Sequence, residues 1–229
     1  MNALFGLVAA ALTLFTAPAL AIGLADLSNK DTVAAMKEAL TKGSQAAVEM
    51  LAKQDGFLGN ERVRIPLPES LHKIEGLMRG LGMGKYADEL VTTMNRAAET
   101  AVVEAKPLLV NAVKSMSVQD AKGILTGGED AATQYFKRST SAALSDKFLP
   151  IVKKATQRVK LADKYNEFAG KGARFGLVDA RDADLNNYVT RKALDGLFLM
   201  IAEEEKKIRK DPVGSASSII SKVFGAIGK

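Results

Sequence analysis

Apolar side chains recur every three to four residues along most of the chain, the spacing that gathers them on one face of an α-helix. A first helix is predicted to begin at about Ser28, which with Asp31 resembles a capping box, and to run to a break at residue 55. Residues 55–68 interrupt the pattern with two glycine turns and the pair Pro66 and Pro68. Since a residue before proline is pushed out of the α region, we predict an extended connector there, and one such stretch cannot make a sheet.

Further helices are predicted between this connector and residue 159. A helix after the connector is expected to end in the glycines at 80, 82 and 84, and a longer one then meets Pro107, which bends or restarts it. Ser117 and Asp120 are predicted to cap a short helix that stops at two glycines. The next helix is expected to end at about Ser145, followed by a separate piece that contains Pro150.

The chain contains a possible internal repeat. Pro107 and Pro150 lie 43 residues apart, and so do Asp120 and Asp163. A period of this length is typical of two-helix units that stack and cover each other's apolar face. We therefore predict an all-α fold with proline-bent helices and no sheet. It is either a multi-helix bundle or a short array of two helical-hairpin units, residues 84–126 and 127–169; chance matching among similar helices is the alternative to a true repeat.

The longest helix is predicted over residues 185–210, where acidic side chains near its end are followed three to four residues later by basic ones. A last segment, 215–227, carries its large apolar residues on one stripe, with Lys222 as its only internal charge. This segment is predicted to dock on the fold as a final helix. The alternative is that it lies on a membrane surface.

The first 21 residues contain no charged side chain and hold an apolar run followed by alanines at 17, 19 and 21. The run is too short for a stable membrane anchor, and a signal peptidase needs small residues at alternating positions, so a signal peptide cleaved after Ala21 is predicted. It lacks the usual Lys or Arg, and a buried N-terminal helix is the alternative. Residues 22–229 are expected to form a single domain in the periplasm, without a cysteine at the cleavage site to carry a lipid.

Positive charge is concentrated in one part of the chain. Ten basic and three acidic side chains lie between Lys137 and Arg174, a surplus larger than the net charge of +6. Such a field attracts anionic lipid headgroups, lipopolysaccharide or nucleic acid, and export makes nucleic acid the least favoured partner. The predicted basic face comprises Lys147, Lys153, Lys154, Arg158, Lys160 and Lys164. A solvated helix surface without a partner is the alternative.

Patterns for catalysis and cofactors are sparse. His72 is the only histidine and there is no cysteine, which excludes a His/Cys zinc site and a cysteine nucleophile. The glycines at 80, 82 and 84 lack the preceding strand and the spacing of a phosphate-binding loop. We expect no catalytic residue and no cofactor, and we interpret His72 as a helix-surface residue.

An acidic run from Asp179 to Asp184 places oxygen ligands at alternating positions, as calcium requires. A calcium loop beginning at Asp182 would also need glycine at Asn187 and glutamate at Ala193, and both are missing. Capping of the following helix by Asp182 or Asp184 is therefore predicted, and no metal site is expected.

Several long and uncommon strings recur in a known family: 27–31 (LSNKD), 55–58 (DGFL), 63–68 (VRIPLP), 120–128 (DAKGILTGG), 131–136 (AATQYF), 193–198 (ALDGLF) and 203–209 (EEEKKIR). Together they resemble the DUF4197 family, helical envelope proteins of Gram-negative bacteria without an assigned function. The resemblance spans nearly the whole mature chain and implies an all-helical envelope protein, but it implies no catalytic residues. Some members resemble lipoproteins with a cysteine at the cleavage site, which this chain lacks.

Two non-enzymatic functions are predicted. In the first, Met- and Ala-rich helices hold a lipid or other hydrophobic molecule in an apolar groove. In the second, the basic face associates with an anionic membrane surface or an envelope protein. An enzyme would need a carboxylate- or lysine-based mechanism, for which the sequence offers little.

The groove is predicted where the two prolines bend neighbouring helices in the same sense and leave a concave face. It would be flanked by Lys153 and Lys154. Its candidate lining residues are Leu108, Leu109, Ile151 and Val152, with the rings of Tyr135 and Phe136. The alternative is that these residues belong to an ordinary core and that the prolines begin new helices.

Overall fold

The computed structural model describes residues 29–211 except 83, 177 and 180. Its regular structure is helical throughout: α1 (Asn29–Ala52), α2 (Glu69–Gly80), α3 (Gly84–Ala101), the 3₁₀ turn η2 (Val102–Glu104), α4 (Ala105–Ser115), α5 (Val118–Thr126), α6 (Ala131–Thr156), α7 (Lys160–Arg174) and α8 (Leu185–Lys210). No strand occurs in this part of the chain, so the all-α prediction is confirmed. The predictions for the signal peptide, 1–21, and for segment 215–227 lie outside the described residues.

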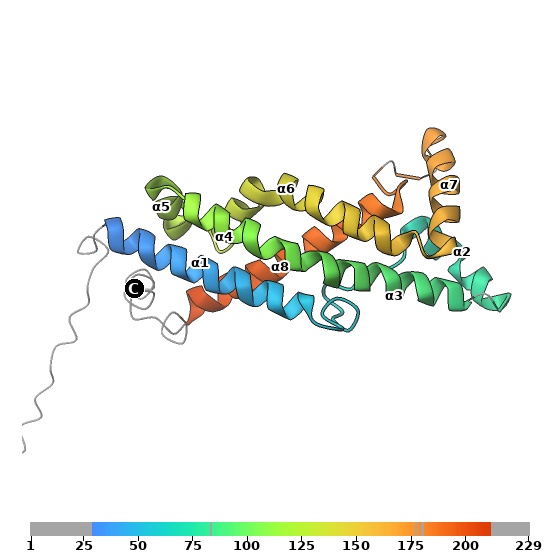
Figure 1. Ribbon diagram of the computed structural model, residues 1–229, viewed down its shortest axis with the longest axis horizontal. Coiled ribbons are helices and arrows are strands. Elements are labelled where there is room, and N and C mark those ends of the chain that lie inside the picture. The colour runs from blue at the N-terminus through green and yellow to red at the C-terminus, as the bar shows by residue number, and fades with distance from the viewer. Residues whose placement is uncertain (1–28, 83, 177, 180, 212–229) are drawn as a thin grey trace, which may run out of the picture.

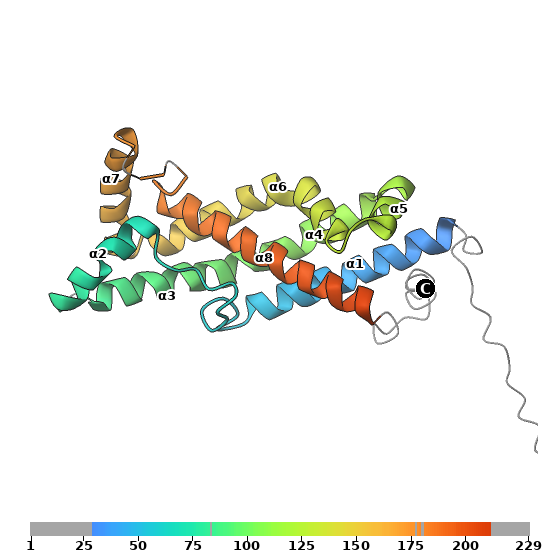
Figure 2. The ribbon, with the colours of Figure 1, turned by 180° about the vertical axis from the view of Figure 1, so that it is seen from behind.

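The long helices lie roughly along one axis and give the described part an elongated shape (Figures 1 and 2). α3, η2 and α4 follow one another as a nearly continuous rod, and α6 packs against that rod in the opposite direction. α8 packs against both α6 and α1. α2 and α7 lie at one end of the molecule, and α5 lies at the other end (Figure 1).

A single cluster of buried apolar side chains runs through this bundle. Its largest fully buried members include Phe136 and Phe148 of α6, Leu197 of α8 and Phe57 of the connector. Among the residues that the structure describes, no helix combines the length and the apolar character needed to cross a bilayer.

Two predicted caps are confirmed. The Ser117 hydroxyl accepts a hydrogen bond from the Asp120 backbone N–H at 3.1 Å, and an Asp120 carboxylate oxygen accepts one from the Ser117 N–H at 3.0 Å, which completes the capping box of α5. These bonds from Ser117 hold the pKa of Asp120 below its ordinary value. Asp184 caps α8 by accepting from the Asn187 N–H at 3.0 Å.

The prolines act differently from the prediction for α6. The expected end near Ser145 is wrong, because α6 continues as one helix through Pro150 to Thr156. Pro150 removes the bond to the Asp146 carbonyl, but Asp146 is exposed to water, while the buried side of the helix keeps its packing. Pro107 lies in the first turn of α4, where a missing N–H costs little, directly after η2.

The order of a long helical rod followed by a short helix occurs twice, as α3 to α5 and as α6 to α7. The two short helices begin differently, because Ser117 caps α5 whereas Val159 at the start of α7 makes no side-chain cap. The 43-residue repeat therefore stays a prediction.

Two buried polar side chains of α3 hold the extended connector against the bundle. The Asn95 amide accepts from the Ile65 N–H at 2.8 Å and donates to the Ile65 carbonyl at 2.9 Å, as a neighbouring strand would. Glu99 accepts from the N–H groups of Phe57 and Leu58, both at 3.1 Å. The connector thus satisfies its backbone groups without a sheet, as buried backbone must.

Gly196 of α8 lies directly against this connector. A Cβ atom at Gly196 would lie 2.8 Å from the Phe57 ring and 3.2 Å from Cβ of Val63. Because Phe57 is completely buried and has no free space to move into, Gly196→Ala is expected to destabilise the protein by about 1 to 3 kcal/mol. Urea unfolding measures the difference.

Gly123 of α5 is the matched control, because a Cβ there meets nothing within 4 Å. Gly123→Ala is expected to stabilise the protein by about 0.5 to 1 kcal/mol through helix propensity. Equal changes in the free energy of unfolding for the two substitutions would show that the close contact at Gly196 does not affect stability.

Candidate functional site

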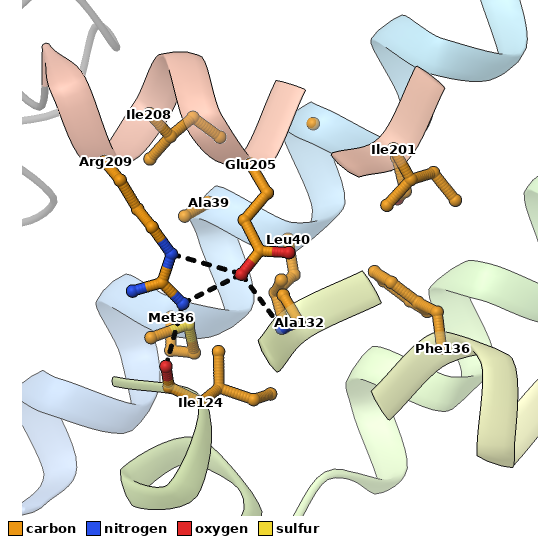
Figure 3. Close-up of a pocket in the computed structure, with 12 residues that line it drawn as sticks. Met36, Ala39, Leu40, Ile124, Ala132, Phe136, Ile201, Glu205, Ile208 and Arg209 are labelled. Atoms are coloured by element: carbon orange, nitrogen blue, oxygen red, sulfur yellow. Dashed lines mark hydrogen bonds and ion pairs between the residues drawn. The ribbon is translucent and has the colours of Figure 1, made fainter. Parts of the chain in front are cut away.

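The helical core holds a small apolar cavity beside the carboxylate of Glu205 (Figure 3). Side chains of α1, α5, α6 and α8 line it: Met36, Ala39, Leu40, Gly43, Ser44, Ile124, Ala132, Phe136, Ile201, Glu205, Ile208 and Arg209. Its volume is about 20 Å³, enough for about one water molecule. This cavity cannot hold a lipid.

Glu205 is a buried carboxylate that closes the N-terminus of α6. It accepts hydrogen bonds from the backbone N–H groups of Ala132 and Thr133 and from the Thr133 hydroxyl, each at 2.9 Å. The first turn of a helix has unpaired N–H groups and a positive dipole end, so a carboxylate from α8 suits this position. Asp130, the cap residue of α6 itself, makes no side-chain cap bond.

Arg209 balances the charge of Glu205 at 2.8 Å and also donates to the Ile124 carbonyl of α5 at 2.9 Å. The pair therefore joins α5, α6 and α8, and its contacts are structural. The sequence predicted that the acids of the run 203–205 pair with bases three to four residues on, as Glu205 and Arg209 do, but it did not show that this pair is buried. The signal that could have found Glu205 is its place on the stripe of Leu197 and Ile201, four residues apart along the buried face of α8.

The six candidate groove residues occupy different environments. Leu109, Phe136 and Val152 are completely or almost completely buried in the core. Leu108 and Ile151 are partly buried and pack against that core. Tyr135 is buried and donates a hydrogen bond from its hydroxyl to the Ala112 carbonyl at 2.7 Å.

The two pairs of candidate residues that follow the prolines, Leu108 with Leu109 and Ile151 with Val152, do not lie together. Tyr135 meets Ala112 near the end of α4, and Leu109 lies about one turn from Ala112. Ile151 lies roughly 24 Å further along α6 than Tyr135 and faces α3 instead. Because α4 and α6 run in opposite directions, Leu108 and Leu109 lie at a different point along the described bundle from Ile151 and Val152, and a groove that they share stays a prediction.

All six residues of the basic face are exposed, but they do not share one surface. Lys147 and Lys154 lie seven residues apart on one stripe of α6, and Lys153 points about 100° away from Lys154. Arg158 lies in the turn after α6. Lys160 and Lys164 belong to α7, which runs across the end of the bundle (Figures 1 and 2).

A surface hollow of about 480 Å³ lies between α3 and α6 and includes part of the basic face. We call it the α3–α6 hollow, and it is lined by Glu89, Thr92, Thr93, Arg96, Ala97, Thr100, Ile151, Lys154, Ala155, Arg158 and Val159. Arg96 pairs with Glu99 at 2.7 Å and with Asp55 at 2.8 Å, and hydrogen bonds to these carboxylates raise its pKa. Its charge is therefore balanced.

Lys154 and Arg158 differ from Arg96, because neither has a carboxylate partner among the described residues. The α3 side of the hollow was missed by sequence reasoning. The signal for it is weak: Thr93, Arg96 and Thr100 recur at helical spacing as a polar stripe, but nothing in the sequence pairs that stripe with α6.

A second, more polar hollow of about 700 Å³ adjoins α2, α3 and the connector and includes His72. His72 is exposed and its Nδ1 lies 3.1 Å from Glu75, while Arg79 bridges Glu75 and Asp88 at 2.7 Å each. The Arg79 guanidinium holds the pKa of Asp88 below its ordinary value. In the described part of the chain, no three His, Asp or Glu side chains gather closely enough to hold a metal ion.

The fold and these hollows define an elongated all-helical protein with polar surface hollows between its helices. The family described as "Protein of unknown function (DUF4197)" matches residues 26–225, and the chain belongs to that family. No curated protein and no solved structure matches the chain.

Proposed function

We propose that this protein is a non-enzymatic binding protein of the bacterial cell envelope that associates with anionic, phosphate-bearing membrane surfaces through exposed cations of α6, of the turn after it and of α7. The observation that carries the proposal is that these cations are exposed to solvent and lack carboxylate partners. Lys147, Lys153, Lys154, Arg158 and Lys160 are exposed and have no carboxylate partner among the described residues. Exposed, unpaired cations on a rigid helical support attract anionic headgroups by roughly 1 kcal/mol each.

The other function predicted from the sequence, a lipid held inside the bundle, has less support. Lipid-sized ligand sites are typically cavities of roughly 300 to 1,000 Å³. The core cavity beside Glu205 measures about 20 Å³, and Leu109, Phe136 and Val152 are packed into the core. An association at the surface needs no such cavity.

The location in the periplasm is part of the same proposal. It is supported by the charge-free apolar run and the alanines at 17, 19 and 21. Cleavage after Ala21 is expected to be visible as a mature N-terminus at Ile22 in protein purified from the periplasm, read by intact-mass spectrometry. A measured mass that still includes residues 1–21 would contradict this location.

Binding to anionic vesicles is expected to depend strongly on salt. Mature protein should sediment with phosphatidylglycerol vesicles at low salt, and the apparent affinity should fall at least about tenfold as the Debye length shrinks from about 30 Å to about 3 Å. Vesicles of phosphatidylcholine alone are the control and should bind little protein. Binding that is equal on both lipids, or insensitive to salt, would contradict the proposed function.

A further inference from the structure

Two cations without a carboxylate partner, Lys154 and Arg158, line the α3–α6 hollow together with one carboxylate, and two other hollows of the described residues suit an anion less. The hollow beside His72 contains two arginines, Arg64 and the already paired Arg79, and three carboxylates that outnumber them: Glu61, Glu75 and Asp88. A hollow of about 300 Å³ between α2 and α7 is walled mainly by apolar side chains, and its two hydroxyls, Ser70 and Tyr165, contact each other at 3.2 Å. Neither arrangement favours an anion. The α3–α6 hollow does.

We propose that the α3–α6 hollow binds the phosphate group of an anionic phospholipid headgroup between Lys154 and Arg158. The inference rests on the proposed function and gives that function a specific site. Lys154 lies in the last turn of α6 and Arg158 in the turn that follows α6, and both line the same hollow. Two like charges that line one hollow repel each other, so an anion that bridges them relieves a repulsion already present in the fold.

The opposite wall of the hollow supplies neutral donors. The hydroxyls of Thr92 and Thr93 on α3 line it, and within the described residues neither has a hydrogen-bond partner. Hydroxyl groups and cations on facing walls are a common way to hold phosphate oxygens. Arg96 is fixed by Glu99 and Asp55, so it shapes the wall but adds little free charge.

The apolar part of the lining distinguishes a lipid from a free phosphate ion. Ile151 and Ala155 of α6, Val159 at the start of α7 and Ala97 of α3 contribute to the same hollow. Inorganic phosphate gains nothing from apolar contact, whereas the glycerol and the first acyl carbons of a phospholipid do. We therefore assign the hollow to a phospholipid headgroup.

Glu89 lies in the same hollow and is the only carboxylate among its described lining residues. Its negative charge opposes an anion bound beside it, since no cation pairs with Glu89 in the described structure. Replacing it with glutamine should therefore tighten binding. If the hollow had only a structural role, replacing Glu89 with glutamine would not tighten binding.

The test is an NMR titration of ¹⁵N-labelled mature protein with dihexanoyl phosphatidylglycerol below its micelle concentration. Amide shifts are expected at Thr92, Thr93, Lys154 and Arg158. Substituting Lys154→Gln with Arg158→Gln should weaken binding roughly 30-fold, about fivefold for each cation. Glu89→Gln should strengthen it by about twofold or more. All three positions are exposed, so each variant is expected to fold.

The control variant carries Lys153→Gln with Lys160→Gln, which removes the same charge outside the hollow. It should keep its affinity for the short-chain lipid within about twofold. Equal weakening of both double variants would overturn the site while leaving vesicle association intact, whereas absence of vesicle binding by wild-type protein would contradict the proposed function itself. Displacement of the lipid by an equal concentration of inorganic phosphate would overturn the assignment to a lipid headgroup.

Discussion

Replacing Phe136 with alanine is expected to cost about 3 to 5 kcal/mol of unfolding free energy. Phe136 is 0% exposed and lies where α6 meets α8 and α1 beside the core cavity (Figure 3). Truncation would remove its ring and enlarge a cavity that now measures about 20 Å³, and packed neighbours can collapse into such a space only in part. The thermal midpoint should fall by roughly 6 to 20 °C.

Phe175→Ala is the matched control, because the same side chain is 79% exposed at the end of α7. This substitution is expected to change the unfolding free energy by less than about 0.5 kcal/mol. Urea unfolding of both variants compares them directly. If the Phe136 variant melted at the same temperature as wild type, Phe136 would not act as a core residue and would again be a candidate for a ligand site.

Replacing Glu205 with alanine is expected to cost a similar amount, about 3 to 5 kcal/mol. Its carboxylate is only 6% exposed, and its loss leaves Arg209 without its partner and two N–H groups of α6 without an acceptor. Substituting both partners, Glu205→Leu with Arg209→Leu, should recover part of the loss, because no unpaired charge remains. It should not recover all of it, since the helix N-terminus stays uncapped.

Glu203 of the same helix provides the control, because its pair with Arg62 at 2.9 Å is largely solvated. Glu203→Ala is expected to leave the unfolding midpoint almost unchanged. If Glu205→Ala proved as mild as Glu203→Ala, the buried pair would contribute nothing to the joining of α5, α6 and α8.

The candidate site was only partly predictable. The sequence pointed to the cations of α6 and α7, because their excess over acidic residues is large and local. It could not show that Lys154 and Arg158 face Thr92 and Thr93, since these residues are about 60 positions apart and only the antiparallel packing of α3 and α6 brings them together. For the same reason the sequence could not place the candidate groove residues, because sequence spacing does not fix where Pro107 and Pro150 lie relative to each other.

The sequence by itself determined the local structure of this protein. Helical periodicity, the Ser117 and Asp184 caps and the Pro66 and Pro68 pair predicted helices and an extended connector, because each depends on interactions within a few residues. Only the tertiary structure decided that α6 continues as one helix through Pro150 and that Asn95 and Glu99 hold the connector. It also decided that the side chain of Glu205 on α8 is buried and caps the N-terminus of α6. Each of these outcomes depends on a backbone group satisfied, or a face buried, by a partner far away in the sequence.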